Sequence, residues 1–294
     1  MKIKKIPYVN LKKCLINLSK KRMERIKLSK RIKSVILGTL LGDAALNIQK
    51  NFKNARFQMR HGHVQKEYFD WKVQILKSLG TEKAVHFQEP DGYQKKKHVG
   101  KWHFQTRALP ELTQIFEIVC SSKKRKQIKR SWLNHLTKES LMVLWLDDGS
   151  LLRKKGVLCT EGFSKKENLI LSKYLKQVWK IDTNVIPILK KRNLPTPLVL
   201  SNKGVGRFHH PSVEREVEQE QRFYYRIRIN TTNLTKFFRL IIPFIPCASM
   251  VYKVCIDYVD PELKQRWISI LKQQLPQFSK KILEVYANRV SLKK

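Results

Sequence analysis

Two apolar segments of this chain each contain an aspartate next to small residues. Residues 34–46 read SVILGTLLGDAAL and contain Asp43, and residues 141–149 read LMVLWLDDG and contain Asp148. If both segments are helices, each aspartate lies at a helix C-terminus, where unpaired carbonyl oxygens and the negative end of the helix dipole already gather. A carboxylate at such a place costs a few tenths to about 1 kcal/mol, so a cation should lie nearby. A hard divalent ion with oxygen ligands, most simply Mg²⁺, fits this pair.

The glycines of the first segment predict how the two aspartates meet. Gly38 and Gly42 lie four residues apart and form a bare stripe where a second helix can approach closely. If the two segments pack along this stripe, Asp43 and Asp148 arrive at the same place. Either segment alone is more typical of an ordinary core helix. Two such segments at the same position in two copies of one pattern favour a functional pair.

The elements that position the two aspartates repeat along the chain in the same order. In the first copy, polar alternation and helical spacing predict a strand at 55–61, a helix at 64–79, a strand at 101–107 and a helix from Pro110 to about Val119. In the second copy they predict a helix capped by Thr137, a strand at 157–163, a helix at 165–179, strands at 183–189 and 223–230, and a helix at 233–242. We interpret both copies as the order helix–strand–strand–helix–strand–strand–helix, which predicts an α+β fold with two αββαββα halves related by a pseudo-two-fold axis.

Composition changes mark the boundaries of these copies. An irregular stretch at about 193–222, with several prolines, glycines and glutamates, interrupts the second copy. Asp260-Pro261-Glu262 has the residue types of a helix start. We therefore expect a basic N-terminal arm at 1–33, a first half at 34–130, a second half at 131–258 and a C-terminal helical extension at 259–294.

The charge of the chain indicates a polyanionic partner. Its 61 Lys and Arg against 23 Asp and Glu give a formal net charge of +38. Self-repulsion on this scale is tolerated mainly by proteins that bind a polyanion, and nucleic acid is the leading candidate. A membrane is not expected, because apolar runs such as 141–146 are too short to cross one. The five cysteines form no C-x-x-C pair, so neither a zinc ribbon nor a disulfide framework is indicated.

Three of the expected strands carry polar side chains that suit contact with DNA bases. Arginine reads guanine, and glutamine or asparagine reads adenine, when a sheet lies in the major groove. The candidates are Arg56, Gln58 and Arg60 on the first strand, Lys101, His103, Gln105 and Arg107 on the second, and Tyr224, Arg226, Arg228 and Asn230 on the third. The alternative is the solvated face that any antiparallel sheet has, and the net charge favours DNA. The basic run Lys123-Lys124-Arg125-Lys126, with Lys129 and Arg130, either clamps phosphates between the halves or forms a solvated linker.

These residues resemble a known family. ILGTLLGDA at 36–44 and LMVLWLDDG at 141–149 are similar to the paired LAGLIDADG motifs of single-chain homing endonucleases, the intron-encoded type found in organelles. The first copy departs from the motif letters at Gly42 and Ala44, whereas LWLDDG is closer to a common variant. KQI at 126–128, FIPCASMVYK at 244–253 and GVLCTEGFSKKE at 156–167 resemble other segments of the family. The resemblance covers about residues 34–256.

The resemblance implies a DNA-cutting site and names its residues. Asp43 and Asp148 would hold divalent ions, Mg²⁺ or Mn²⁺, with the backbone carbonyls of Gly42 and Asp147 as further ligands. Lys126 and Lys253 would neutralise charge that develops on the phosphate. They follow the aspartates by 83 and 105 residues, and the difference is about the length of the stretch at 193–222. Gln58 and Glu161, 15 and 13 residues after the aspartates, would line the water network, although each is equally typical of a solvent-facing strand residue.

The sequence therefore predicts a monomeric, site-specific double-strand DNA endonuclease whose two sheets form a DNA-binding saddle, encoded in a chloroplast or mitochondrion. The alternative is an RNA maturase that binds its host intron RNA, with or without nuclease activity. A transcription regulator that keeps this fold without catalysis is disfavoured, because both aspartates are present. A zinc nuclease is disfavoured because His61, His63, His209 and His210 lack consistent ligand spacing.

Overall fold

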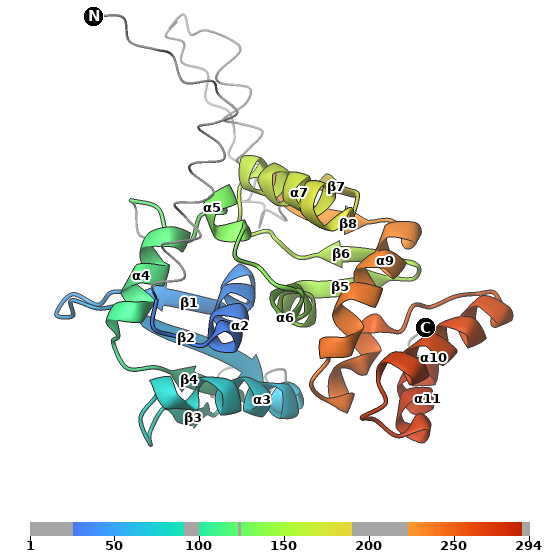
Figure 1. Cartoon of the computed structure of the whole chain (residues 1–294), viewed down its shortest axis with the longest axis horizontal. Helices are drawn as coiled ribbons and strands as arrows, with labels where there is room; N and C mark the ends of the chain where they lie inside the picture. Colours follow the sequence, from blue (N-terminus) through green and yellow to red (C-terminus); the bar gives the residue numbers. More distant parts are fainter. Residues whose placement is uncertain (1–25, 91–99, 123–124, 190–222, 290–294) are drawn as a thin grey trace, which may run out of the picture.

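The computed structural model describes residues 26–90, 100–122, 125–189 and 223–289. Most of the basic arm expected at 1–33, nearly all of the insertion expected at 193–222, and the pair Lys123-Lys124 lie outside the described residues. Two halves with the same order of elements are followed by two further helices (Figure 1). The expected α+β class with two similar halves is confirmed.

The first half starts with the helix of the first apolar segment and continues into a four-stranded antiparallel sheet. Its elements are α2 (Lys30–Leu41), β1 (Ala44–Asn47), β2 (Arg56–Gly62), the 3-10 turn η1 (His63–Gln65), α3 (Lys66–Leu76), η2 (Lys77–Leu79), β3 (Val85–Gln88), β4 (Lys101–Gln105) and α4 (Pro110–Val119). The strands lie in the order β1-β2-β4-β3. Ser29 starts α2 because its hydroxyl accepts a hydrogen bond from the Ile32 amide at 3.2 Å.

The second half repeats this topology. Its elements are α5 (Arg130–Leu133), α6 (Lys138–Asp148), β5 (Gly149–Leu152), β6 (Lys155–Leu158), α7 (Lys165–Trp179), β7 (Thr183–Leu189), β8 (Phe223–Ile229) and α9 (Thr231–Ile241). The strands lie in the order β5-β6-β8-β7, which matches the first sheet strand for strand. Thr137 caps α6 as the sequence predicts, in a capping box with Ser140.

The two motif helices, α2 and α6, pack side by side at the centre of the molecule (Figure 1). Residues 34–41 of α2 and 140–147 of α6 are all buried, which explains why α6 is apolar on every side. The bare stripe predicted from the glycines is confirmed, since a Cβ on Gly38 would lie 2.6 Å from the Ser140 carbonyl oxygen. The Ser140 hydroxyl donates to the Ser34 carbonyl at 2.9 Å and joins the halves across this contact.

Three expected strands end earlier than the sequence predicts. The strand at 157–163 is correct only to Leu158, because the Phe163 amide bonds to the Thr160 carbonyl in a turn that leads to the capping box of α7. The strand at 223–230 ends at Ile229, because the Asn230 side chain caps α9. The strand at 101–107 ends at residue 105. In the first two cases a hydrogen bond outside the sheet takes the place of ladder pairing.

The C-terminal extension is helical, as predicted. Asp260 caps α10 (Pro261–Gln274), and α11 (Lys280–Arg289) follows. Both helices lie near η5 (Ala248–Val254), which follows η4 (Ile242–Phe244). The Trp267 indole donates to the Val254 carbonyl at 2.9 Å and ties α10 to η5. No helix within the described ranges is both long and apolar enough to cross a membrane.

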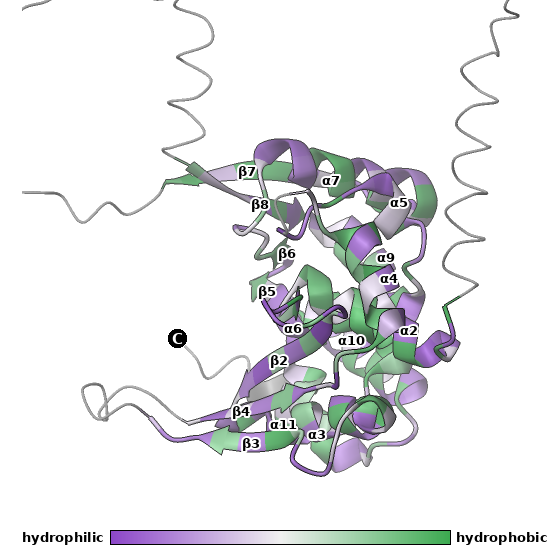
Figure 2. Cartoon of the chain, turned by 90° about the vertical axis from the view of Figure 1, so that its left-hand side faces the viewer, coloured by the Kyte–Doolittle hydropathy of each residue, from purple (hydrophilic) through white to green (hydrophobic). Residues whose placement is uncertain are grey.

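The two sheets lie on opposite sides of α6 and expose their strands on the same side of the molecule. Figure 2 shows this in profile, with the strands of both sheets toward the left of the view, most helices toward the right, and hydrophilic residues along β2 and β4. The apolar alternate residues, such as Phe57 and Met59 on β2 and Ile227 and Ile229 on β8, are buried in one continuous core. The polar residues of the same strands therefore face away from the helices.

Candidate metal centre and nucleic-acid face

The two aspartates lie together where α2 and α6 end. Asp43 directly follows Gly42, the C-cap of α2, and Asp148 is the last residue of α6. A Cβ on Gly42 would lie 2.8 Å from the Asp147 Cβ and 3.1 Å from Asp148 Oδ2. Only glycine leaves space for the second helix end to come this close. The arrangement concentrates acidic side chains at the negative ends of two helix dipoles.

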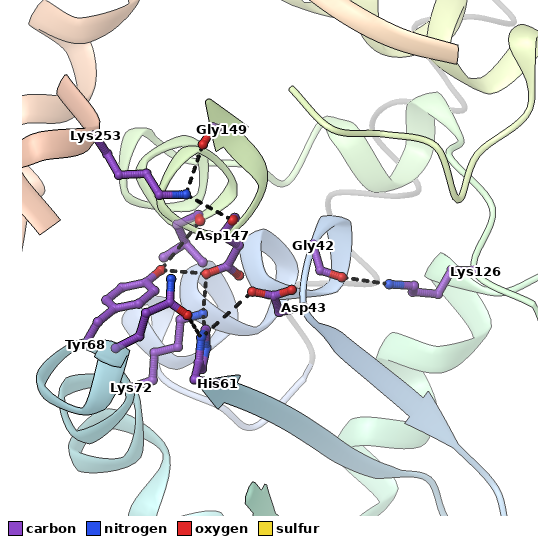
Figure 3. A network of polar contacts seen from close by, with 11 residues as sticks. Gly42, Asp43, His61, Tyr68, Lys72, Lys126, Asp147, Gly149 and Lys253 are labelled. Atoms are coloured by element: carbon purple, nitrogen blue, oxygen red, sulfur yellow. Dashed lines mark hydrogen bonds and ion pairs between the residues drawn. The ribbon is translucent and has the colours of Figure 1, made fainter. Parts of the chain in front are cut away.

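A lysine sits behind each helix end in the same way (Figure 3). Lys126 Nζ donates to the carbonyl oxygens of Gly42 at 3.2 Å and Ala44 at 2.8 Å. Lys253 Nζ donates to the carbonyl oxygens of Asp147 at 3.3 Å and Gly149 at 2.9 Å. The two lysines thus occupy equivalent places. The Gly42 and Asp147 carbonyls, which are candidate metal ligands, each accept from one lysine. Each carbonyl oxygen keeps a second lone pair that could bind a metal ion.

Burial and the proximity of the acids to one another shift their pKa values. Burial, and then the neighbouring carboxylates of Asp43 and Asp147, raise the pKa of Asp148 to about 7. Burial and then Asp147 raise the pKa of Asp43, against the lowering effect of His61. Burial likewise lowers the pKa of Lys126 and Lys253. A cation between the carboxylates would relieve this repulsion.

A buried charge network, which the sequence analysis missed, adjoins Asp43. The Lys72 ammonium on α3 contacts Asp147 Oδ1 at 2.6 Å, and the Tyr68 hydroxyl donates to the same oxygen at 2.9 Å. The Lys72 and Asp147 side chains are both 0% exposed. Lys72 also contacts His61 Nε2 at 3.1 Å, and His61 Nδ1 lies 3.8 Å from Asp43 Oδ2. The available signal was a lysine one helical turn after Tyr68, on an otherwise apolar helix face.

Asp43, His61 and Asp147 form a group that could hold a metal ion. Each offers one ligand atom, and these atoms lie within 4.8 Å of one another. Asp147 Oδ2 is buried and, among the described residues, has no hydrogen-bond partner. Such an oxygen suits a hard divalent cation. The residues present therefore fit a divalent ion at this end of the motif helices.

Gln58 and Glu161 do not lie at equivalent positions of the two sheets. Ala44 pairs with Met59 in the first sheet, and the equivalent Gly149 pairs with Leu158 in the second. The position equivalent to Gln58 is therefore Val157, not Glu161. Gln58 lies half-buried on β2. Glu161 lies in the turn after β6, where it forms an ion pair with Arg226.

The candidate DNA-contacting residues divide into exposed and internally bonded groups. The exposed ones are Arg60, Lys101, Arg107, Tyr224 and Arg228, with Arg56 and Gln105 half-buried. His103 is only 8% exposed and bonds to Gln88 at 2.8 Å. The Arg107 guanidinium donates to the Ser78 carbonyl at 3.0 Å. Asn230 is a correction, because its side chain accepts hydrogen bonds from Asn233 at the start of α9 and does not extend the strand face.

The described residues of the basic run after α4 make ion pairs and hydrogen bonds within the protein. Arg125 pairs with Glu167 at 3.0 Å, and Lys129 donates to the Cys120 carbonyl at 3.0 Å. Arg130 donates to Asn134 at 2.7 Å. These contacts hold the described residues of the run in place around Lys126.

Two cavities open near the polar faces of the sheets. One of about 550 Å³ lies at the outer end of the first sheet, beside Arg56, Lys83 and Arg107, away from the aspartates. A smaller one of about 190 Å³ borders Asp148 and Gly42 and is lined also by Lys126, Cys159 and Thr160. The second cavity therefore belongs to the site, and the first belongs to the candidate DNA face.

Comparison with known proteins gives consistent relatives. Residues 33–195, more than half of the chain, match the model of the LAGLIDADG DNA endonuclease family. The chain is 28% identical to DNA endonuclease I-ChuI of Chlamydomonas applanata over 172 residues, which are 54% of this chain and 77% of that protein. It is 27% identical to protein RecA of Mycobacterium gastri over 166 residues, 51% of this chain and 37% of RecA. The chain thus spans little more than a third of the RecA relatives.

The fold has a counterpart among solved structures. The homing endonuclease I-WcaI bound to its DNA recognition sequence is 20% identical, with a TM-score of 0.59 over 86% of this chain and 95% of that chain. This likeness supports the arrangement of two antiparallel sheets around paired helices. The RNA-maturase alternative gains no support from these matches.

Proposed function

Because the chain belongs to the LAGLIDADG DNA endonuclease family, we propose that it is a site-specific endonuclease that cuts both strands of duplex DNA. The observation that carries the proposal is the paired site. Two carboxylates meet at the ends of α2 and α6, and each helix end is backed by a lysine that donates to the carbonyls on both sides of its aspartate. Two similar half-sites in one chain suit two antiparallel strands.

The aspartates and lysines have separate tasks in this proposal. Asp43 and Asp148, with the carbonyls of Gly42 and Asp147, hold divalent ions, and Mg²⁺ is the natural occupant because all these donors are oxygens. A divalent cation, when bound, supplies activation of water and stabilisation of the leaving oxygen. Lys126 and Lys253 contribute fixed positive charge next to the phosphate. The raised pKa of Asp148, about 7, is consistent with a site that needs a cation.

The sheets supply the grip on DNA. Exposed side chains such as Arg60 on β2 and Arg228 on β8 lie on the polar strand faces and suit base edges in the major groove. The net charge of +38 supports the same partner through contact with phosphates. We propose that residues 34–130 and 131–258 each cover one half of a long asymmetric target, that 1–33 is a DNA-contacting arm, and that 259–294 supports the second half.

The gene is proposed to lie in an organelle, where it would be carried by an intron. The support is the relative I-ChuI from Chlamydomonas applanata together with the intron-encoded character of the resemblance. Sequencing the DNA on both sides of the reading frame tests this. An enclosing intron in chloroplast or mitochondrial DNA is the expected result, and it would also name the joined flanking sequence as the target.

Cleavage of a defined duplex tests the function directly. Purified protein should cut the joined flanking sequence, or a site selected from a random duplex library, in Mg²⁺ but not in EDTA. Asp43→Asn and Asp148→Asn should each abolish cutting and keep most of the binding, since both changes preserve side-chain size. Cutting that survives either substitution or EDTA would contradict the mechanism. Tight binding to intron RNA without any DNA cleavage would contradict the function.

A further inference from the structure

Each of the two aspartates has a lysine in the equivalent place, Lys126 or Lys253, but their other neighbours are very different. The sheet register makes His61 on β2 equivalent to Thr160 after β6, and the helix ends make Gly42 equivalent to Asp147. Beside Asp43 the space is filled by the buried side chains of Lys72, His61 and Asp147. Beside Asp148 the corresponding space is the cavity of about 190 Å³ lined by Gly42 and Thr160. The pseudo-symmetry of the fold therefore breaks at the first neighbours of the carboxylates.

Lys72 determines which way His61 faces Asp43. An ammonium has only donors, so the contact of Lys72 Nζ with His61 Nε2 at 3.1 Å requires a lone pair on Nε2. The ring is then neutral with its proton on Nδ1, the nitrogen that lies 3.2 Å from Gln65 Oε1 and 3.8 Å from Asp43 Oδ2.

Lys72 is itself held in place. It contacts Asp147 at 2.6 Å, lies 4.5 Å from the centre of the Tyr68 ring and is 0% exposed. A chain of fixed polar contacts thus runs from the second motif helix through α3 and β2 to the first motif carboxylate. Among the described residues, no histidine or lysine side chain lies within 4.0 Å of the Asp148 carboxylate oxygens in the way that His61 lies beside Asp43.

We propose that Lys72 is a positioning residue for Asp43: acting through His61, it fixes the orientation of this carboxylate and leaves that of Asp148 untouched. It follows that the two DNA strands depend unequally on Lys72. The inference rests on the proposed function, in which each aspartate serves one scissile phosphodiester. In this arrangement the Nδ1–H of His61 donates to Gln65 at 3.2 Å and lies 3.8 Å from Asp43 Oδ2, so it acts on the carboxylate by electrostatic attraction. Of the group Asp43, His61 and Asp147, the oxygens would then bind the ion and His61 would position Asp43.

The first experiment needs no DNA. The tautomer of His61 is read from its ring nitrogen shifts by NMR of the full chain, with and without Mn²⁺ as the metal probe. We expect the Nδ1–H form in the wild type, and a shift toward the other tautomer in Lys72→Met/Asp147→Asn. This double variant removes both buried charges and keeps an oxygen that accepts from Tyr68. A wild-type ring protonated on Nε2, or direct coordination of Mn²⁺ by Nδ1, overturns the proposal.

The second experiment measures each strand separately on a duplex that the wild type cuts, with one strand end-labelled at a time. In Lys72→Met/Asp147→Asn, cleavage of one strand should fall about 10- to 100-fold more than that of the other, so nicked duplex accumulates. Leu171→Ala, in the buried face of α7 and outside the network, is the matched control. It lowers the folded fraction and should leave the strand ratio unchanged.

The outcomes separate the two hypotheses. If the double variant slows cleavage of both strands equally, the positioning role of Lys72 is overturned. Cleavage by the wild type still upholds the proposed function in that case. A wild type that cuts no duplex in Mg²⁺ overturns the function, and the strand inequality with it. The tautomer measurement then still decides whether Lys72 fixes His61.

Discussion

The ends of the two motif helices have equivalent lysine–carbonyl contacts, but the neighbours of their carboxylates differ. Behind them, Lys126 and Lys253 make the same pair of carbonyl contacts within a few tenths of an ångström. In front, Asp43 borders a packed charge network and Asp148 borders a cavity. Backbone carbonyls are presented wherever a helix ends, so their partners survive divergence of the side chains. Contacts between side chains require particular residues in both halves, so they differ first.

The largest effect should come from breaking the network on one side. Lys72→Met should lower the free energy of unfolding by about 3–5 kcal/mol, because it leaves the buried carboxylate of Asp147 without its counter-charge. Urea denaturation measures this. Lys72→Met/Asp147→Asn should recover most of the loss. A single variant as stable as the wild type would show that the pair contributes nothing and that the two sides differ only in shape.

The similarity of the lysines can be tested next. Lys126→Met and Lys253→Met should each slow cleavage about 100-fold, the usual cost of removing a fixed donor beside developing charge. Because their contacts match, the two losses should agree with each other more closely than those of any residues on the front side. Single-turnover cleavage at saturating enzyme gives both rates. A large loss for one lysine alone would extend the asymmetry to the back of the site.

The closeness of the helices is tested by glycine substitutions. Gly38→Ala should lower the free energy of unfolding by about 1–3 kcal/mol through overpacking, since its Cβ would lie 2.6 Å from a backbone oxygen of α6. The control is Gly162→Ala, where a Cβ would meet nothing within 4 Å. If both variants unfold at the same urea concentration, the helices are free to separate and the shared site is not tightly built.

The smallest effect should be the pH response of the more open side. The pKa of Asp148 is raised to about 7 from 3.8, so between these values the folded state binds more protons than the unfolded state. Stability of the metal-free protein should therefore fall as pH rises from about 4 to 7. Urea denaturation at pH 5 and pH 8 in EDTA, repeated with Asp148→Asn and with Mg²⁺, measures this. A difference that Asp148→Asn leaves unchanged would assign it to other groups.

The pattern of the sequence predicts the fold better than it predicts the site. Period and caps place α4, α7 and β7 correctly, because local spacing and residues such as Ser164 and Pro110 act within one element. The ends of β6 and β8 were misplaced, because a turn at Thr160 follows β6 and the Asn230 side chain caps α9 directly after β8. Periodicity alone did not show where these strands end.

The residues of the site likewise fall into those that the sequence pattern reveals and those that it does not. Asp43, Asp148 and their lysines are visible because they recur in a repeat. Lys72 and His61 are visible in no repeat, because each occurs in one half only and finds its partners through tertiary packing. A charged residue on a buried helix face signals such a network, but the sequence alone does not say that its counter-ion lies 75 residues away.

The unequal network also decides how the halves would behave as separate molecules. If the gene were divided between them, two copies of the first half would bring Lys72 against Gly42 without the Asp147 carboxylate. Two copies of the second half would bury Asp147 without the Lys72 ammonium. Only one copy of each half restores this buried pair. The Lys72–Asp147 contact therefore favours the pairing of unlike halves over the pairing of like ones.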